Sequence, residues 1–104
     1  MRRVLLIGAA SLLPLLAQSA EPTGKQLFNQ KCAMCHGAVG MGTGLLARRM
    51  KPEIAPLEKR EDLSAAYVER AARVGILNMP PITRGDVGDA QLASIAQYLA
   101  KGKP

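Results

Sequence analysis

The five residues Cys32-Ala33-Met34-Cys35-His36 constrain the fold of this chain more than any other feature. They contain both of its cysteines and its only histidine. Two cysteines three positions apart lie on the same face of a helix. Their thiols can then form thioethers to the two vinyl groups of one haem, and the histidine that follows can bind the iron. We therefore predict one covalent haem c on Cys32 and Cys35, with His36 as the proximal ligand of the iron.

Other sites with similar motifs fit the chain less well. A structural zinc site needs about four ligands, and two cysteines with one histidine leave one position without a candidate. A thioredoxin-like pair opens a helix after a strand, and no strand-like run precedes Cys32. A disulfide between Cys32 and Cys35 would close a very small loop and add little stability. A redox dithiol and a disulfide remain as the alternatives to haem.

Residues 1–20 have the pattern of a secretory signal peptide. An arginine pair precedes the apolar stretch Val4–Leu16, and small residues favour cleavage after Ser19 or Ala20. This stretch is shorter than the ~20 apolar residues of a membrane span, which makes an uncleaved anchor the less favoured alternative. We expect residues 21–104 to form one domain in the periplasm, with no membrane span after cleavage.

The expected domain has about 84 residues. A core of that size is marginal without a covalent or metal-based staple. One Phe, two Tyr and no Trp are present, so a porphyrin would replace aromatic side chains at the centre. Without the arginine pair the domain has 12 basic and 8 acidic residues, a formal charge of +4. No basic stripe is interleaved with aromatic residues, and we expect no binding to nucleic acid.

Capping residues and apolar periodicity predict an all-α domain. Three main helices are expected, over residues 24–33, 65–74 and 89–101. Thr23 and Gln26 form a capping box before the first, and Ser64 is a favourable N-cap of the second. The four glycines within residues 37–44 predict a loop, which a short helix follows over residues 45–50.

Apolar stripes predict which side of each helix is buried. The residues expected in the core are Leu27, Phe28, Val68, Ala71, Ala72, Leu92, Ile95, Ala96 and Leu99. Glu69, Arg70 and Arg73 lie on the other side of the second helix and are expected to face water.

The second axial position of the iron has no histidine left to fill it, so methionine is the expected ligand. Met79 lies 43 residues after His36, between two predicted helices, and two prolines restrict the backbone after it. Met34 points away from the haem face, and Met41 follows the histidine too closely to reach the opposite side of the ring. We predict Met79 as the sixth ligand, with Met50 or an iron lacking a sixth protein ligand as alternatives.

The sequence resembles the small class I c-type cytochromes of bacterial periplasms over nearly all of residues 21–104. The resemblance rests on Gly24, Phe28, Cys32–His36, Met79-Pro80, Leu92 and Tyr98-Leu99. It implies three to four short helices around one covalent haem, with the first and last helices crossing at the glycine and the aromatic residues. Many relatives also have a proline whose carbonyl orients the proximal histidine, where this chain has Thr43-Gly44-Leu45.

The resemblance implies an electron carrier rather than an enzyme, in which His36 and Met79 stay bound while the iron alternates between Fe(II) and Fe(III). The run from Ala66 to Pro80 is most similar to cytochrome subunits that accept electrons from flavin-dependent phenol or alcohol dehydrogenases. We expect such a donor, and a downstream cytochrome or oxidase of the respiratory chain. The alternative is a haem enzyme, or a sensor of peroxide or a diatomic gas, whose sixth ligand dissociates.

Docking is expected where the haem edge is exposed, beside the attachment helix and the methionine loop. The residues there, which we name the uncharged rim, are Ala33, Met34, Ala38, Val39, Met41, Asn78, Pro80 and Pro81. Lys31 and the basic cluster Arg48–Lys51 are expected to steer a partner from outside this rim.

Overall fold

The computed structural model describes residues 8–10 and 20–104, so most of the predicted signal peptide lies outside the described residues. The described part is all-α and contains no strand. Its helices are α1 (Gly24–Lys31), α2 (Ala33–His36), α3 (Met41–Leu46), α4 (Ala65–Val74) and α5 (Asp89–Ala100), with 3-10 turns at Pro52–Ile54 and Leu57–Lys59. None of the described helices has the length and apolar character needed to cross a bilayer.

The predicted capping box opens α1. The Thr23 hydroxyl accepts a hydrogen bond from the Gln26 amide at 3.2 Å, and the Gln26 side chain accepts one from the Thr23 amide at 2.9 Å. The predicted helix is interrupted at Cys32, where φ is −125°. The hydrogen bonds continue across this kink, because the Cys32 amide donates to the Phe28 carbonyl and the Cys32 carbonyl accepts from His36. The attachment motif therefore begins a separate turn, α2.

The two later helices have nearly the predicted bounds. Ser64 caps α4 by accepting a hydrogen bond from the Tyr67 amide at 3.1 Å, and Gly75 ends the helix with a φ of +80°. Helix α5 ends one residue earlier than predicted, because Lys101 adopts the left-handed conformation with a φ of +52°.

Helices α1 and α5 pack closely at Gly24, as the resemblance implies. A Cβ atom at Gly24 would lie 2.3 Å from the Ser94 carbonyl oxygen, so only glycine allows this approach. The rings of Phe28 and Tyr98 are 6.1 Å apart between centroids and inclined by 53°, which is within the range of favourable aromatic pairs.

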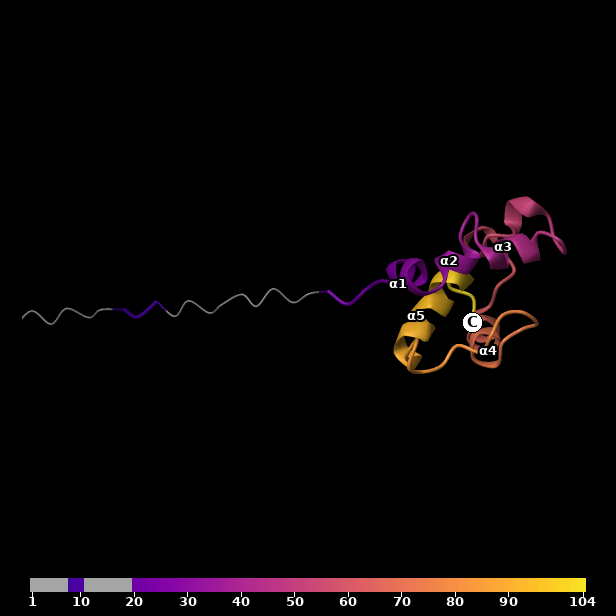
Figure 1. Ribbon diagram of the computed structural model, residues 1–104. Coiled ribbons are helices and arrows are strands. Elements are labelled where there is room, and N and C mark those ends of the chain that lie inside the picture. The colour runs from indigo at the N-terminus through magenta and orange to yellow at the C-terminus, as the bar shows by residue number, and fades with distance from the viewer. Residues whose placement is uncertain (1–7, 11–19) are drawn as a thin grey trace, which may run out of the picture.

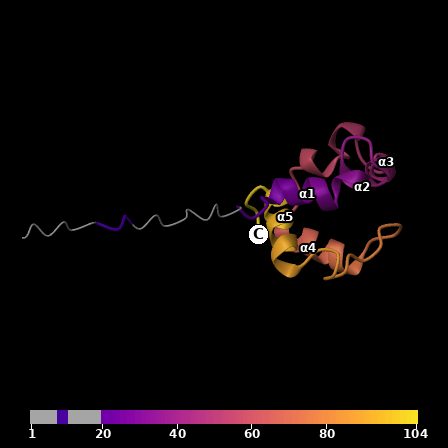
Figure 2. The ribbon, with the colours of Figure 1, turned by 60° about the vertical axis from the view of Figure 1, so that its left-hand side comes forward.

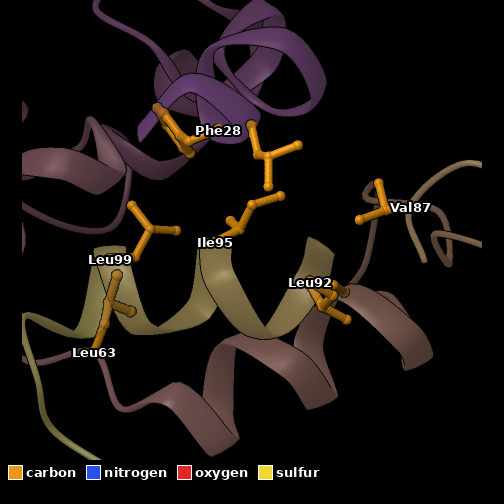
Figure 3. Close-up of a cluster of buried hydrophobic side chains, with 8 residues drawn as sticks. Phe28, Leu63, Val87, Leu92, Ile95 and Leu99 are labelled. Carbon is orange, nitrogen blue, oxygen red and sulfur yellow. The ribbon is translucent and has the colours of Figure 1, made fainter. Parts of the chain in front are cut away.

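The buried core follows α5, which packs against both α1 and α4. Figure 3 shows Ile95 and Leu99 extending from α5 toward the side chain of Phe28. The cluster consists of Leu27, Phe28, Leu63, Ala72, Val87, Leu92, Ile95 and Leu99. The predicted core positions on α1 and α5 are confirmed, whereas on α4 only Ala72 is fully buried, and Val68 and Ala71 are half-buried.

The prediction of a loop over residues 37–44 was wrong from residue 41 on, because α3 begins at Met41 and includes two glycines. The short helix predicted over residues 45–50 therefore starts earlier and ends at Leu46. Close packing against α2 explains Gly42. A Cβ atom at Gly42 would lie 2.8 Å from the Cys35 carbonyl oxygen and 2.9 Å from the His36 ring. The buried hydroxyl of Thr43 also donates a hydrogen bond to the carbonyl of Gly37. Contacts with α2 therefore stabilise a helix that its own residues disfavour.

The orientation expected for Arg73 was also wrong. Its side chain is only 18% exposed, and it contacts the segment between α4 and α5 instead of water. In Figures 1 and 2, α2 and α3 lie on one side of the molecule, and α4 with this segment lies on the other.

Candidate functional site

A cavity of about 560 Å³ lies between these two sides. Its volume is typical of sites that bind small molecules and cofactors, about 300–1,000 Å³. Its lining includes Cys32, Cys35 and His36, which lie at the kink before α2 and within α2. Met79 lines it from the α4–α5 segment. Leucine, isoleucine and valine side chains from α3, α4 and α5 complete most of the wall. The four predicted site residues therefore face one largely apolar cavity.

The two cysteines lie at the kink and within the turn that follows it. Cys32 is half-buried, Cys35 is exposed, and no disulfide joins them. Burial raises the pKa of the Cys32 thiol, and the nearby Cys35 raises it further. Both cysteines line the cavity, as thioether formation with one flat ligand requires.

The imidazole of His36 lies between α2, α3 and the cavity. Its Nδ1 atom is buried and has no hydrogen-bond partner among the described residues. A buried polar atom without a partner is unfavourable, which indicates that a ligand belongs beside the ring. Burial also lowers the pKa of His36, and this favours the neutral imidazole that binds metals. No carbonyl among the described residues, that of Thr43 included, accepts a hydrogen bond from Nδ1 of His36. The side chain of Thr43 bonds the Gly37 backbone instead.

The backbone around Met79 forms a tight turn. The amide and carbonyl of Met79 are hydrogen-bonded to the carbonyl and amide of Ile76 at 2.8 and 3.1 Å. At the tip, Leu77 has a φ of +51°, which is uncommon for a residue other than glycine. Gly75 is needed at the base, where a Cβ atom would lie 2.7 Å from the Met79 carbonyl oxygen. The turn therefore holds the half-buried Met79 beside the cavity.

The other described methionines differ in burial and position. Met34 is 90% exposed and does not line the cavity. Met41 is 75% exposed and belongs to α3, which packs on the same side as His36. Met50 is half-buried and also lines the cavity. Three methionines therefore line the cavity, namely Met41, Met50 and Met79. Of these, only Met79 comes from the α4–α5 segment.

Three arginines in the cavity wall form a feature that the sequence analysis missed. Arg48 and Arg49 were expected to serve only as part of an outer patch, but both line the cavity. Arg60 also lines it, is 15% exposed, and forms two hydrogen bonds with Asp62 at 2.9 and 2.8 Å. The basic run at 48–51 was a visible signal, whereas nothing local to Arg60 predicted its burial. These guanidinium groups complement the two carboxylates of a haem.

The described residues give no support to a zinc site. No group of three or more His, Cys, Asp or Glu side chains converges anywhere in residues 8–10 and 20–104. By contrast, a covalently attached haem fits the groups that line the cavity, which are two thiols, an unpartnered imidazole, a thioether and an apolar wall.

Comparison with known proteins agrees with this fit. The family model described as cytochrome c oxidase, cbb3-type, subunit III, matches residues 19–99. No curated protein matched the chain. A solved structure of a mutant of OmcF is similar with a TM-score of 0.51 and 24% sequence identity, over 82% of this chain and 100% of that one. At that identity the structural likeness shows the fold alone.

Proposed function

Because this chain belongs to the family described as cytochrome c oxidase, cbb3-type, subunit III, we propose that it is a periplasmic one-electron carrier with His36 and Met79 as axial ligands. Membership establishes the coarser features: a monohaem c-type cytochrome of class I, with the all-α cytochrome c fold, a covalent haem c and a role in electron transfer. We propose, in addition, which residues hold the haem, that the protein is periplasmic, and which partners it has.

The chain's own residues have distinct roles. Cys32 and Cys35 hold the haem covalently, and His36 provides a neutral imidazole from a site where burial disfavours its protonation. Met79 provides a soft thioether, which favours Fe(II) and raises the reduction potential. The apolar wall excludes water and disfavours the additional charge of Fe(III). When bound, the haem supplies the one-electron redox couple.

One observation supports this set of ligands most strongly. His36 belongs to α2 and Met79 to the α4–α5 segment, and both line the same cavity. These two elements lie on opposite sides of the molecule in Figures 1 and 2. Met41 lacks this relation to His36, because α3 packs directly on α2. A thioether opposite the imidazole is the arrangement that two axial ligands require.

Replacement of single methionines tests the assignment. The oxidised protein should show the weak near-infrared absorption that a sulfur–iron bond produces, and Met79→Ala should abolish it and lower the reduction potential. Met50→Ala is the matched control, since Met50 lines the same cavity, and it should retain the band. A band lost in Met50→Ala and kept in Met79→Ala would reverse the assignment. A wild-type protein without the band would favour the sensor or enzyme with an open sixth position.

The donor is proposed to be a flavin-dependent dehydrogenase, on the similarity of the run from Ala66 to Pro80 to cytochrome subunits of such enzymes. The acceptor is proposed to be a further cytochrome or an oxidase. The family description names an oxidase subunit, which supports the second of these. Reduction by a purified dehydrogenase and oxidation by membranes containing the oxidase would test the two steps separately.

A further inference from the structure

The segment that contains Met79 is closed at its base by contacts with the end of α4. The Ile82 amide donates a hydrogen bond to the Ala72 carbonyl at 2.7 Å. The Ile82 carbonyl accepts one from Nη1 of Arg73 at 3.1 Å. Both polar backbone groups of Ile82 are therefore bound to consecutive residues of the same helix. Figure 2 shows this segment extending beyond the end of α4 before it returns to α5.

Arg73 also reaches two points farther along the chain. Its Nη1 atom donates to the Val87 carbonyl at 2.9 Å, and its Nη2 atom to a carboxylate oxygen of Asp89 at 2.8 Å. Asp89 lies in the first turn of α5. The guanidinium group thus joins the end of α4, the base of the methionine segment and the start of α5.

We propose that Arg73 is a positioning residue for Met79. The inference rests on the proposed role of Met79 as an iron ligand. Between Gly75 and Ile82 the segment is restrained mainly by the Ile76–Met79 turn, so its attachment to the rest of the molecule depends on the contacts at its base. Without the guanidinium group, the carbonyls of Ile82 and Val87 both lose their donor. The base then opens more often, and the thioether leaves the iron more often.

The mechanism makes a specific prediction for ligands that compete with Met79. Imidazole binds ferric haem where the methionine has left, so its apparent affinity rises with the fraction of molecules in which the segment is open. Arg73→Met should bind imidazole at least about tenfold more tightly than the wild type and show a weaker sulfur–iron band. Arg73→Lys keeps the charge with fewer donors and should lie between the two.

Two controls separate positioning from general stability. Arg84 also pairs with Asp89, at 3.1 Å, but is 72% exposed and forms no hydrogen bond to the backbone carbonyls that Arg73 binds. Arg84→Gln should therefore bind imidazole as the wild type does. Leu27→Ala removes a buried side chain of α1 outside the cavity wall. It should lower the urea midpoint and leave imidazole affinity unchanged.

The experiment is an optical titration of each purified ferric protein with imidazole, with urea unfolding measured in parallel. Wild-type affinity in Arg73→Met, or an equal rise of affinity in Leu27→Ala, would overturn the inference while the Met79 assignment stands. A wild-type protein without the sulfur–iron band would overturn both. If Arg73→Met fails to incorporate haem, Arg73→Lys decides the matter by the same titration.

Discussion

At the scale of single residues, Tyr98 connects three parts of the domain. Its ring packs against Phe28 of α1, and its hydroxyl donates a hydrogen bond to the carboxylate of Glu58 in the second 3-10 turn. This hydrogen bond, with a contribution from burial, raises the pKa of Tyr98 to about 12. The unfolded chain has the ordinary tyrosine pKa of about 10. The difference between these two pKa values means that protonated Tyr98 makes its whole contribution to the free energy of unfolding below pH ~10. This contribution is lost as the pH rises to about 12.

Tyr98→Phe should lower the free energy of unfolding near neutral pH by about 0.5–1.5 kcal/mol, because the hydrogen bond to Glu58 is lost. The stability of this variant should also fall less steeply than that of the wild type between pH ~10 and ~12. Urea unfolding at a series of pH values measures both effects. Tyr67→Phe is the control, since Tyr67 is 50% exposed, and it should have the wild-type slope. Identical slopes in all three proteins would exclude the proposed contribution of Tyr98.

The cysteines lead to a prediction of the same scale. Since both thiols are adjacent to the cavity, the protein from a host that matures c-type cytochromes should keep its haem stain after denaturation. Its mass should exceed that of the polypeptide by one haem. The combined change Cys32→Ser and Cys35→Ser should remove the covalent haem. A colourless wild-type product of unmodified mass would contradict the attachment site.

At the scale of helices, local signals and long-range contacts had different predictive value. Thr23 and Ser64 each bond to an amide three positions away, so the sequence alone places the starts of α1 and α4. Arg73 binds Val87 and Asp89, which are 14 and 16 residues away, and its helical pattern contains no information about them. Gly42 of α3 shows the same limit, because its close approach to α2, which no local pattern predicts, is what requires a glycine there.

The residues of the candidate site likewise differ in whether local sequence signals or long-range packing determine their positions. The spacing of the attachment motif is a local signal, and it predicted that Cys32, Cys35 and His36 belong to one site. In the structure these three residues line one cavity. Met79 could be selected because the prolines and the flanking helices marked an irregular segment. Arg60 could not be selected, since its burial depends on how Asp62 and the chain before α4 pack.

The two glycines of α3 allow a matched test of this interpretation. Gly42→Ala should destabilise the protein by about 1–3 kcal/mol, because the added methyl group would overlap the Cys35 carbonyl and the His36 ring. Gly44→Ala should stabilise it by about 0.5–1 kcal/mol, since nothing beyond its own turn of helix lies within 4 Å of the added group and alanine favours a helix. Urea unfolding of the two variants provides the comparison. Equal effects would show that α3 is limited by helix propensity and not by packing on α2.

At the scale of the whole molecule, exposed apolar side chains gather in the segments beside the cavity. Val39 is 97% exposed and Met34 90% exposed, both in or next to α2. Met41 and Leu77 are each 75% exposed, and both line the cavity. Three of the four belong to the uncharged rim, and Leu77 adds an apolar side chain at the tip of the Met79 turn. An exposed apolar surface around a redox centre favours docking through close contact.

Ionic strength distinguishes docking through the uncharged rim from docking through charge. Exposed charges are screened beyond a Debye length of ~8 Å at 0.15 M salt, so an interface held by Arg48, Arg49 and Lys51 would weaken steeply from low to physiological salt. An interface formed mainly by the rim should lose less than about tenfold in affinity over the same range, because apolar burial is not screened. The measurement is the rate of electron transfer from the proposed donor, a flavin-dependent dehydrogenase, as salt is added. Val39→Lys should lower this rate at every salt concentration, since Val39 is almost fully exposed and its replacement leaves the core intact. A wild-type rate that falls by more than about tenfold, with Val39→Lys unaffected, would instead assign docking to the basic cluster.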